Sequence, residues 1–219
     1  MPKGKFFVID GTDGSGKKTQ TERLIQRLAA EGFPVEKISF PQYGQPSAKK
    51  VEEYLAGKYG PADAIDARMA SGYYAEDRLA AKPKISGWLD AGTHVVADRF
   101  VASNMGHQGG KIRDPQARRE FFRWNDELEH EQNGLPRPDL NIILHVPAAV
   151  SIALVEKRGH AKDGHEADPG HLERAEQTYL EIARTFPGFV LVECFENGQL
   201  LSMDEVHEKV WAVVRPMLK

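Results

Sequence analysis

The chain has 219 residues and a net charge of −3, from 29 lysines and arginines against 32 aspartates and glutamates. This length suits one domain with a core of its own, which we expect over residues 1–219. The near-neutral charge argues against a protein that coats a nucleic-acid polymer, because such proteins need a basic excess. No apolar run reaches membrane-spanning length, and a single cysteine excludes an intramolecular disulfide. We therefore expect a cytoplasmic protein without a membrane partner.

Apolar, strand-like runs alternate with helical patterns along the chain. Buried strands are predicted at 6–10, 35–40, 94–98, 140–146 and 189–193. Helices are predicted at 17–31, 47–57, 63–80, 83–91, 115–132, 148–157, 171–185 and 204–214. Residues 158–170 are polar and contain glycine, which indicates a loop. This alternation predicts the α/β class, with a parallel sheet covered by helices on both faces, and ligands bind such sheets beyond the carboxyl ends of the strands.

A glycine-rich stretch links the first predicted strand to its helix and has the G-x-x-x-x-G-K spacing of a phosphate-binding P-loop. Glycines let backbone N–H groups converge on phosphate oxygens, while the helix N-terminus and Lys17 add positive charge. We expect the loop over residues 11–19 to bind nucleotide phosphates. Its members are Gly11, Thr12, Asp13, Gly14, Ser15, Gly16, Lys17, Lys18 and Thr19.

The loop departs from the usual pattern directly after its lysine. A serine or threonine hydroxyl normally binds Mg²⁺ there, but this chain has Lys18, with Thr19 one position later. An ammonium group cannot coordinate a metal. We therefore expect phosphates, water and carboxylates to hold Mg²⁺, with Asp13 and Asp98 as the candidate residues.

Residues for a second ligand follow the other predicted strands. Arg99, at the end of the third strand, offers a planar fork for phosphate oxygens. Tyr74 and Arg78 stand four apart on a predicted helix and share a face. A ring, an arginine and an amide such as Asn104 are what a nucleobase pocket requires, although each alone is more often structural.

Five ordered motifs carry a resemblance to the thymidylate kinase family. They are GTDGSGKKTQ at 11–20, FPQY at 40–43, YYAEDR at 73–78, DRFVASN at 98–104 and GLPRPDL at 134–140. The resemblance spans nearly the whole chain. It implies a P-loop NTPase fold with a five-stranded parallel sheet and a small lid at about 157–170, in a protein that is usually a homodimer. It also implies transfer of the γ-phosphoryl group of ATP to dTMP, with Mg²⁺, in pyrimidine deoxynucleotide biosynthesis.

The resemblance assigns the dTMP site residue by residue. Tyr74 would stack on thymine, Arg78 would reach the base edge, and Asn104 would hydrogen-bond the pyrimidine. Arg99 would bind the acceptor phosphate, and Asp13 would hold the deoxyribose 3′-hydroxyl or the metal. The full set implied is Asp13, Phe40, Tyr43, Tyr74, Arg78, Arg99, Ser103, Asn104 and His107.

The resemblance also implies a lid that closes over ATP and a catalytic arginine in either the P-loop or the lid. The P-loop contains no arginine, so Arg158 is the candidate, beside Lys17 and Arg99 as the other catalytic residues. Lys162 would support Arg158. Glu166 matches an acidic position at the end of the lid that contacts the substrate or the metal.

Two alternatives stay open at this point. His107 stands where the family commonly has tyrosine, so the acceptor could be UMP or dUMP, in another nucleoside monophosphate kinase. A deoxynucleoside kinase would need an acidic base after the second strand, and residues 40–43 contain none. Lys18 motivates the second alternative, a nucleotide-binding protein without catalysis.

Some features have plainer interpretations. Charges alternate in sign along the predicted helix 115–132, which is typical of a solvated, ion-paired surface. They come from Arg118, Arg119, Glu120, Arg123, Asp126, Glu127 and Glu129. Cys194, at the end of the last predicted strand, is interpreted as a small buried residue rather than a nucleophile.

Overall fold

A computed structural model gives the structure of residues 2–157 and 169–218. Its centre is a five-stranded sheet in the order β2 (Val35–Ser39), β3 (His94–Asp98), β1 (Phe6–Gly11), β4 (Leu140–His145) and β5 (Phe189–Glu193). Every neighbouring pair is parallel. The predicted α/β class and the five-stranded parallel sheet are confirmed, and each predicted strand lies within one residue of its observed ends.

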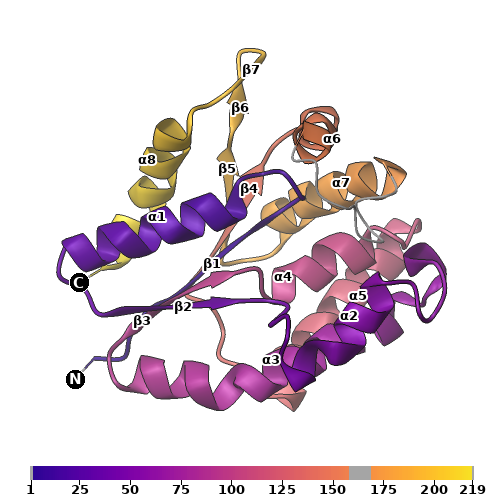
Figure 1. Cartoon of the computed structure of the whole chain (residues 1–219), viewed down its shortest axis with the longest axis horizontal. Coiled ribbons are helices and arrows are strands. Elements are labelled where there is room, and N and C mark those ends of the chain that lie inside the picture. The colour runs from indigo at the N-terminus through magenta and orange to yellow at the C-terminus, as the bar shows by residue number, and fades with distance from the viewer. Residues whose placement is uncertain (1, 158–168, 219) are drawn as a thin grey trace.

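Helices cover both faces of the sheet (Figure 1). Phe7 and Ile9 of β1 point to one face, where they pack with Leu24 of α1 (Lys17–Ala30) and Trp211 of α8 (Met203–Val214). In Figure 1, α1 and α8 lie together on this side. Alternation along the strand sends Phe6 and Val8 to the opposite face, because successive side chains of a strand point to opposite sides.

The second face is covered by α3 (Ala67–Asp90), which buries Ala81, Ile85 and Leu89 against the sheet. The sequence predicts two helices here, separated at Pro83, because proline removes a helix hydrogen bond. That prediction is wrong, since one helix continues through Pro83. Each large buried side chain contributes about 1.5–3 kcal/mol, which offsets the roughly 3 kcal/mol cost of an internal proline.

The helix α3 also begins later than predicted. Its N-terminus is capped by Asp66, whose side chain accepts hydrogen bonds from the backbone N–H groups of Arg68 and Met69. Residues 62–64 instead form a short 3₁₀ turn, Ala62–Ala64. Asp63 therefore lies on this separate turn, outside the helix predicted for 63–80.

The remaining helices are α2 (Lys49–Leu55), α4 (Val101–Ser103), α5 (Pro115–Asp126), α6 (Ala148–Lys157) and α7 (Pro169–Thr185), of which α7 packs on β4 and β5. There are 3₁₀ turns at Pro46–Ala48, before α2, and at Arg215–Met217, after α8. The chain winds as a π-helix at Asn104–Gln108 and Glu127–Gln132. The helical stretch 101–108 was not predicted, nor was the hairpin of β6 (Phe195–Glu196) and β7 (Gln199–Leu200). No helix in the described parts of the chain is both long and apolar enough to cross a membrane.

The predicted lid lies almost entirely outside the described residues. Arg158, Lys162 and Glu166 all fall in residues 158–168, which are not among them. The predicted loop 158–170 is too long at its end, because α7 already begins at Pro169.

Candidate active site

The P-loop follows the central strand, and two of its glycines show why the motif needs them. Gly11 has φ = 139°, and a Cβ atom there would stand 2.5 Å from the carbonyl oxygen of Leu144 on β4. Gly16 has φ = 85° and lies at the N-cap of α1. The glycines thus let the loop pass close to β4 and turn its N–H groups toward the start of the helix, where an anion is stabilised.

Lys17 is drawn into the loop itself. Its side chain is 7% exposed, and Nζ donates to the carbonyl oxygen of Thr12 at 2.8 Å and lies 3.7 Å from Oδ1 of Asp13. Burial lowers the pKa of Lys17 to about 8, and the nearby charge of Arg99 acts in the same direction. The ammonium stays charged at neutral pH, and a phosphate beside it would stabilise that charge further.

Arg99 occupies an uncommon backbone conformation at the end of β3. Its φ is 66°, in the left-handed region that costs a non-glycine residue about 1–2 kcal/mol. The guanidinium donates to Oδ1 of Asp13 through NH2 and contacts Nε2 of His107 at 3.1 Å through NH1. Burial alone would lower the pKa of Arg99, but the charge of Asp13 and other nearby acidic groups raises it above its usual range. Strain of this kind is retained where the surrounding contacts define a functional geometry.

A carboxylate that sequence reasoning missed holds this strained turn. Asp10, fully buried on β1, accepts hydrogen bonds from the hydroxyls of Ser103 (2.8 Å) and Tyr179 (2.7 Å). It also accepts from the backbone N–H of Gly11 at 2.9 Å and of Phe100 at 3.3 Å. Asp10 therefore joins the P-loop to the segment after β3. No sequence signal distinguishes it, because it ends an ordinary apolar strand.

Two cavities open at this edge of the sheet. We call the first the inner cavity, of about 480 Å³, and the second the loop cavity, of about 1170 Å³, and both volumes include space open to solvent. The inner cavity lies on the side of α2 and α3, and the loop cavity lies along the P-loop and the start of α8. Asp13 and Arg99 line both cavities. A ligand in each would therefore approach the other at these two side chains.

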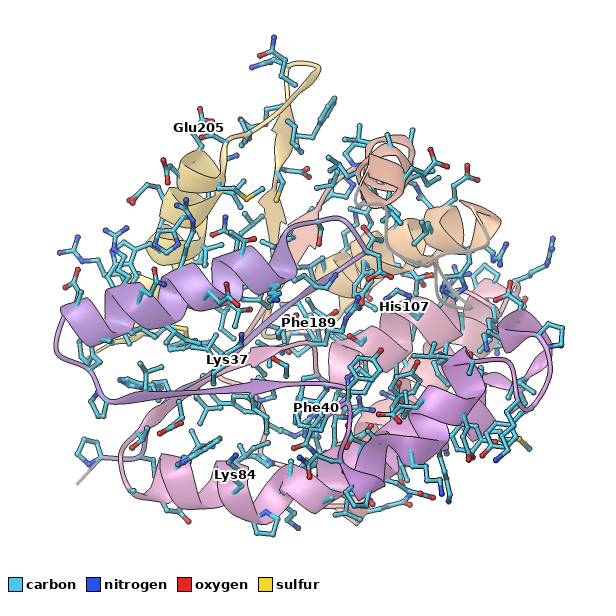
Figure 2. The ribbon with its side chains drawn as sticks, viewed as in Figure 1. Lys37, Phe40, Lys84, His107, Phe189 and Glu205 are labelled. Carbon is cyan, nitrogen blue, oxygen red and sulfur yellow. The ribbon has the colours of Figure 1, made fainter. Side chains whose placement is uncertain are left out.

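The inner cavity brings together all nine residues predicted to bind the second ligand. They are Asp13, Phe40, Tyr43, Tyr74, Arg78, Arg99, Ser103, Asn104 and His107, joined by Pro41, Leu55 and Gln108. They come from separate segments of the chain. Figure 2 labels two of them, Phe40 just beyond β2 and His107 in the helical layer beyond the carboxyl edge of the sheet.

Two motifs of the inner cavity are tied to each other by a buried aspartate, Asp77. Its Oδ2 accepts from the backbone N–H of Gln42 at 2.8 Å, and its Oδ1 accepts from the hydroxyl of Ser47 at 2.6 Å. Asp77 thereby anchors the segment 40–43 on α3. Tyr74, one turn earlier on α3, meets the ring of Tyr54 edge-on at 6.2 Å, which orients its face.

Arg78 is buried, although a helical arginine is usually exposed. Its side chain is 1% exposed and is held by Glu129, which is fully buried, through Nε at 3.0 Å and through NH2. Its NH1 donates to the carbonyl oxygen of Phe100 at 3.2 Å. The interpretation of Glu129 as part of a solvated surface is therefore wrong. The sequence did contain a sign that Glu129 is buried. Phe122, Asn125 and Glu129 are spaced by three and four positions, so they share the buried face of the helix.

Apart from Cys194, the apolar residues of the loop cavity belong to no motif of the sequence. Beyond the P-loop this cavity is lined by Val146, Leu154, Cys194, Leu200, Leu201, Met203 and Val206. Val146 follows β4, Leu154 lies on α6, and the others come from the stretch that runs from the end of β5 through the β6–β7 hairpin into α8, so together they form an apolar wall beside the phosphate-binding loop. Gln20 of α1 donates to the carbonyl oxygen of Met203 at 2.9 Å and ties this wall to the loop. Cys194 is buried, as predicted, and burial raises its pKa to about 12, so its thiol is inert.

The carboxylates fit a magnesium ion held partly by phosphates. Asp98 lies opposite Ile9 in the sheet and lines the loop cavity. Burial raises its pKa, against the nearby charge of Lys17. No group of three or more histidine, cysteine or acidic residues among the described residues could form a metal cage. One or two carboxylates beside phosphates are what Mg²⁺ prefers.

We expect Asp98→Asn to have two opposite effects. Because the pKa of Asp98 is raised in the fold, its ionised form costs stability above that pKa, so the variant should have a higher Tm at pH 8. The gain should vanish near pH 3, where the carboxyl is protonated in both states. The Mg²⁺ concentration for half-maximal activity should rise about tenfold. Thermal unfolding without nucleotide measures the Tm, and a Mg²⁺ titration of activity measures the metal requirement. An unchanged Mg²⁺ requirement would show that Asp98 does not help to hold the metal.

A parallel sheet, a P-loop after its central strand and a second cavity beside that loop define a P-loop NTPase with space for an acceptor next to a bound nucleotide. A sequence model of the family described as thymidylate kinase matches residues 9–210. The chain belongs to the thymidylate kinase family.

Individual relatives agree with this assignment. The thymidylate kinase of Mycobacterium tuberculosis H37Rv is 32% identical over 184 residues, covering 81% of this chain and 85% of that protein. That of Caulobacter vibrioides is 34% identical over 188 residues, covering 85% and 86%. The solved structure of thymidylate kinase from Candida albicans is similar in fold, with a TM-score of 0.76 at 20% identity, over 98% of this chain and 92% of that one.

Proposed function

We propose that this chain phosphorylates dTMP to dTDP with ATP, as a single domain over residues 1–219. Membership of the family supports the reaction, and one observation on the chain itself carries it. Asp13 and Arg99 line both cavities, so the terminal phosphate of a nucleotide in the loop cavity would meet the phosphate of an acceptor in the inner cavity. The acceptor that fits best is a nucleoside monophosphate, because its phosphate would reach Arg99 while its base lies between Tyr74 and Arg78.

The chemistry needs positioning and charge more than proton transfer. The acceptor phosphate is already ionised, so one of its oxygens can bond to the γ-phosphorus without a general base, while the bond to the β–γ bridging oxygen breaks and ADP leaves. Lys17 and Arg99 stabilise the charge that spreads over the transferred group, and residues 11–19 hold the remaining phosphates through backbone N–H groups. Asp13 and Asp98, with Glu166 as implied by the resemblance, would hold Mg²⁺, which would supply positive charge beside the phosphates.

Arg158 supplies the third cation in this proposal. The P-loop of this chain has no arginine, so Arg158→Ala should lower kcat at least a hundredfold while dTMP binding changes little. Steady-state kinetics and calorimetric titration of dTMP separate the two effects. Lys162→Ala serves as the comparison, with a smaller expected loss, and a wild-type kcat for Arg158→Ala would show that another residue supplies this charge.

A panel of acceptors tests the proposed function. Purified protein with ATP and Mg²⁺ is offered dTMP, dUMP, UMP, CMP and thymidine, and ADP release is followed. We expect the highest kcat/KM with dTMP. Preference for UMP or thymidine would replace dTMP by another acceptor, and ADP release with none of them would favour a nucleotide-binding protein without catalysis.

Assembly and location complete the proposal. We infer a homodimer in the cytoplasm, from the family resemblance and the single, buried cysteine. Sedimentation equilibrium on the full chain measures the assembly, with a mass near twice 24.4 kDa as the expected result.

A further inference from the structure

A row of hydrogen-bonded side chains runs from Arg99 away from the two cavities. NH1 of Arg99 lies 3.1 Å from Nε2 of His107, and Nδ1 of His107 lies 3.2 Å from Nε2 of His171. Nδ1 of His171 lies 3.2 Å from Oδ1 of Asp63. The four residues come from the end of β3, the π-helical segment 104–108, helix α7 and the 3₁₀ turn 62–64. His171 and Asp63 line neither the inner nor the loop cavity.

The chemistry of the two ends determines where the protons lie. A guanidinium only donates, so Nε2 of His107 must accept and carries no proton. The proton of His107 is then on Nδ1 and is donated to Nε2 of His171. The proton of His171 is consequently on Nδ1 and is donated to the carboxylate of Asp63. Every bond in the row points the same way, and both imidazoles are neutral with the proton on Nδ1.

The surroundings favour these neutral imidazoles. His107 is 7% exposed and His171 is 1% exposed, and their rings stack at 5.4 Å with an angle of 10° between their planes. The edge of Tyr179 on α7 meets His107 at 5.8 Å. Burial lowers the pKa of His171, against the charge of Asp63, and the cations Arg174 and Lys111 lower it further. Asp63 is itself paired with Arg174.

We propose that His171 and Asp63 are positioning residues for Arg99, acting through His107 along this one-way row of hydrogen bonds. This inference rests on the proposed function, because that function supplies the acceptor phosphate to which Arg99 would bind. Asp13 holds one terminal nitrogen of the guanidinium and His107 holds the other. A planar guanidinium held at both terminal nitrogens is oriented before the phosphate arrives. Through His171 and Asp63, the row connects Arg99 to α7 and to the 3₁₀ turn before α3.

Protonation would break the row in a defined way. An imidazolium donates from both nitrogens. A second proton on His107 would place an N–H against the N–H groups of Arg99. A second proton on His171 would force His107 into the opposite tautomer, with the same result. Protonation of either ring should therefore release Arg99 from this geometry.

Nitrogen-15 NMR of the imidazoles tests the row without any assay of activity. Two-bond proton–nitrogen spectra of the full chain at pH 7.5 report which nitrogen carries the proton, and His107→Gln and His171→Gln identify the two signals. We expect both residues to be neutral with the proton on Nδ1. A proton on Nε2 of either histidine would contradict the proposed direction of these hydrogen bonds.

Kinetics test the positioning role. His171→Leu keeps the apolar volume but cannot bond, and we expect it to lower kcat with dTMP about tenfold without changing KM for ATP. His171→Gln can accept from His107 and donate to Asp63, so it should stay within about twofold of wild type. Glu181→Gln, which removes the ion pair with Arg118 elsewhere on α7, is the matched control and should leave kcat unchanged. Equal kcat values for the leucine variant and wild type would overturn the role.

A pH profile separates positioning from packing. The titration of the substrate phosphate, near pH 6, is shared by all variants. We expect the acid fall of kcat/KM to be steeper in wild type than in His107→Gln/His171→Gln, which cannot take up these protons. Identical profiles would overturn the inference. A wild-type protein that does not phosphorylate dTMP would instead overturn the proposed function, and the NMR spectra would still show whether the row exists.

Discussion

Replacing Arg99 by methionine should lower kcat with dTMP by about a thousandfold, within the range of 10³ to 10⁵ that a transition-state arginine contributes to phosphoryl transfer. Arg99 lines both cavities and is partly buried beside Asp13, where a charge is less screened by water than on the open surface. Methionine keeps an apolar stem of similar length and removes only the charged fork. Steady-state kinetics with saturating ATP and dTMP measure the loss, and the Tm of the variant checks its folding.

Arg118→Met is the matched control for this experiment. Arg118 is also partly buried and ion-paired, with Glu181 at 2.7 Å, but it lies on α5 and lines neither the inner nor the loop cavity. It should keep kcat within about twofold, because a partly exposed ion pair contributes only about 0–1 kcal/mol to stability. If Arg99→Met kept its kcat and only raised KM, Arg99 would bind the acceptor without acting in the transition state.

Glu129→Leu should destabilise the protein by about 3–5 kcal/mol, the usual cost of removing one partner of a buried ion pair. Glu129 is fully buried and accepts from two nitrogens of Arg78, which is 1% exposed. Leucine fills the space but leaves the guanidinium without its counter-charge. For a chain of this length the loss corresponds to a fall in Tm of roughly 10 °C, measured by thermal unfolding.

The double variant Glu129→Leu/Arg78→Met separates stability from recognition. Two apolar residues replace the pair, so most of the lost stability should return. KM for dTMP should nevertheless remain raised at least tenfold, because Arg78 faces the inner cavity where the base would lie. Arg137→Met, which breaks an exposed pair with Asp126, should change stability by less than about 1 kcal/mol. A double variant with wild-type KM would show that Arg78 contributes to stability and not to dTMP binding.

The predictions that succeeded rest on local patterns. Apolar runs such as those of β1 and β4 between helices indicate a parallel sheet, because both faces of its central strands are buried. The P-loop could be located because its spacing and its glycines are local requirements of the backbone. The segments that follow the strands could be expected at one edge, because parallel strands bring their carboxyl ends together, but the full set of inner-cavity residues came from the resemblance to the thymidylate kinase family.

The predictions that failed concern long-range partners. Glu129 looks like its solvated neighbours in sequence, and only its contact with Arg78, 51 positions away, shows that it is buried. Pro83 indicates a break in the helix, but packing of α3 on the sheet overrides it. Asp10 and Tyr179 are 169 positions apart, and no local pattern pairs them.

The 29 cations and 32 anions of the chain nearly cancel, but this sum does not show where the charged side chains of the site lie. The α/β class and the P-loop can be predicted from the amino acids alone, because they follow from periodicity and backbone requirements along short stretches, and the resemblance to the family adds the set of site residues. How the charges are held is visible only in the folded chain: Arg99 between Asp13 and His107, Arg78 on Glu129, and Lys17 inside its own loop. Net charge is a sum over the chain, whereas the energy of a charge depends on its distance to its partners and on its burial, and folding determines both.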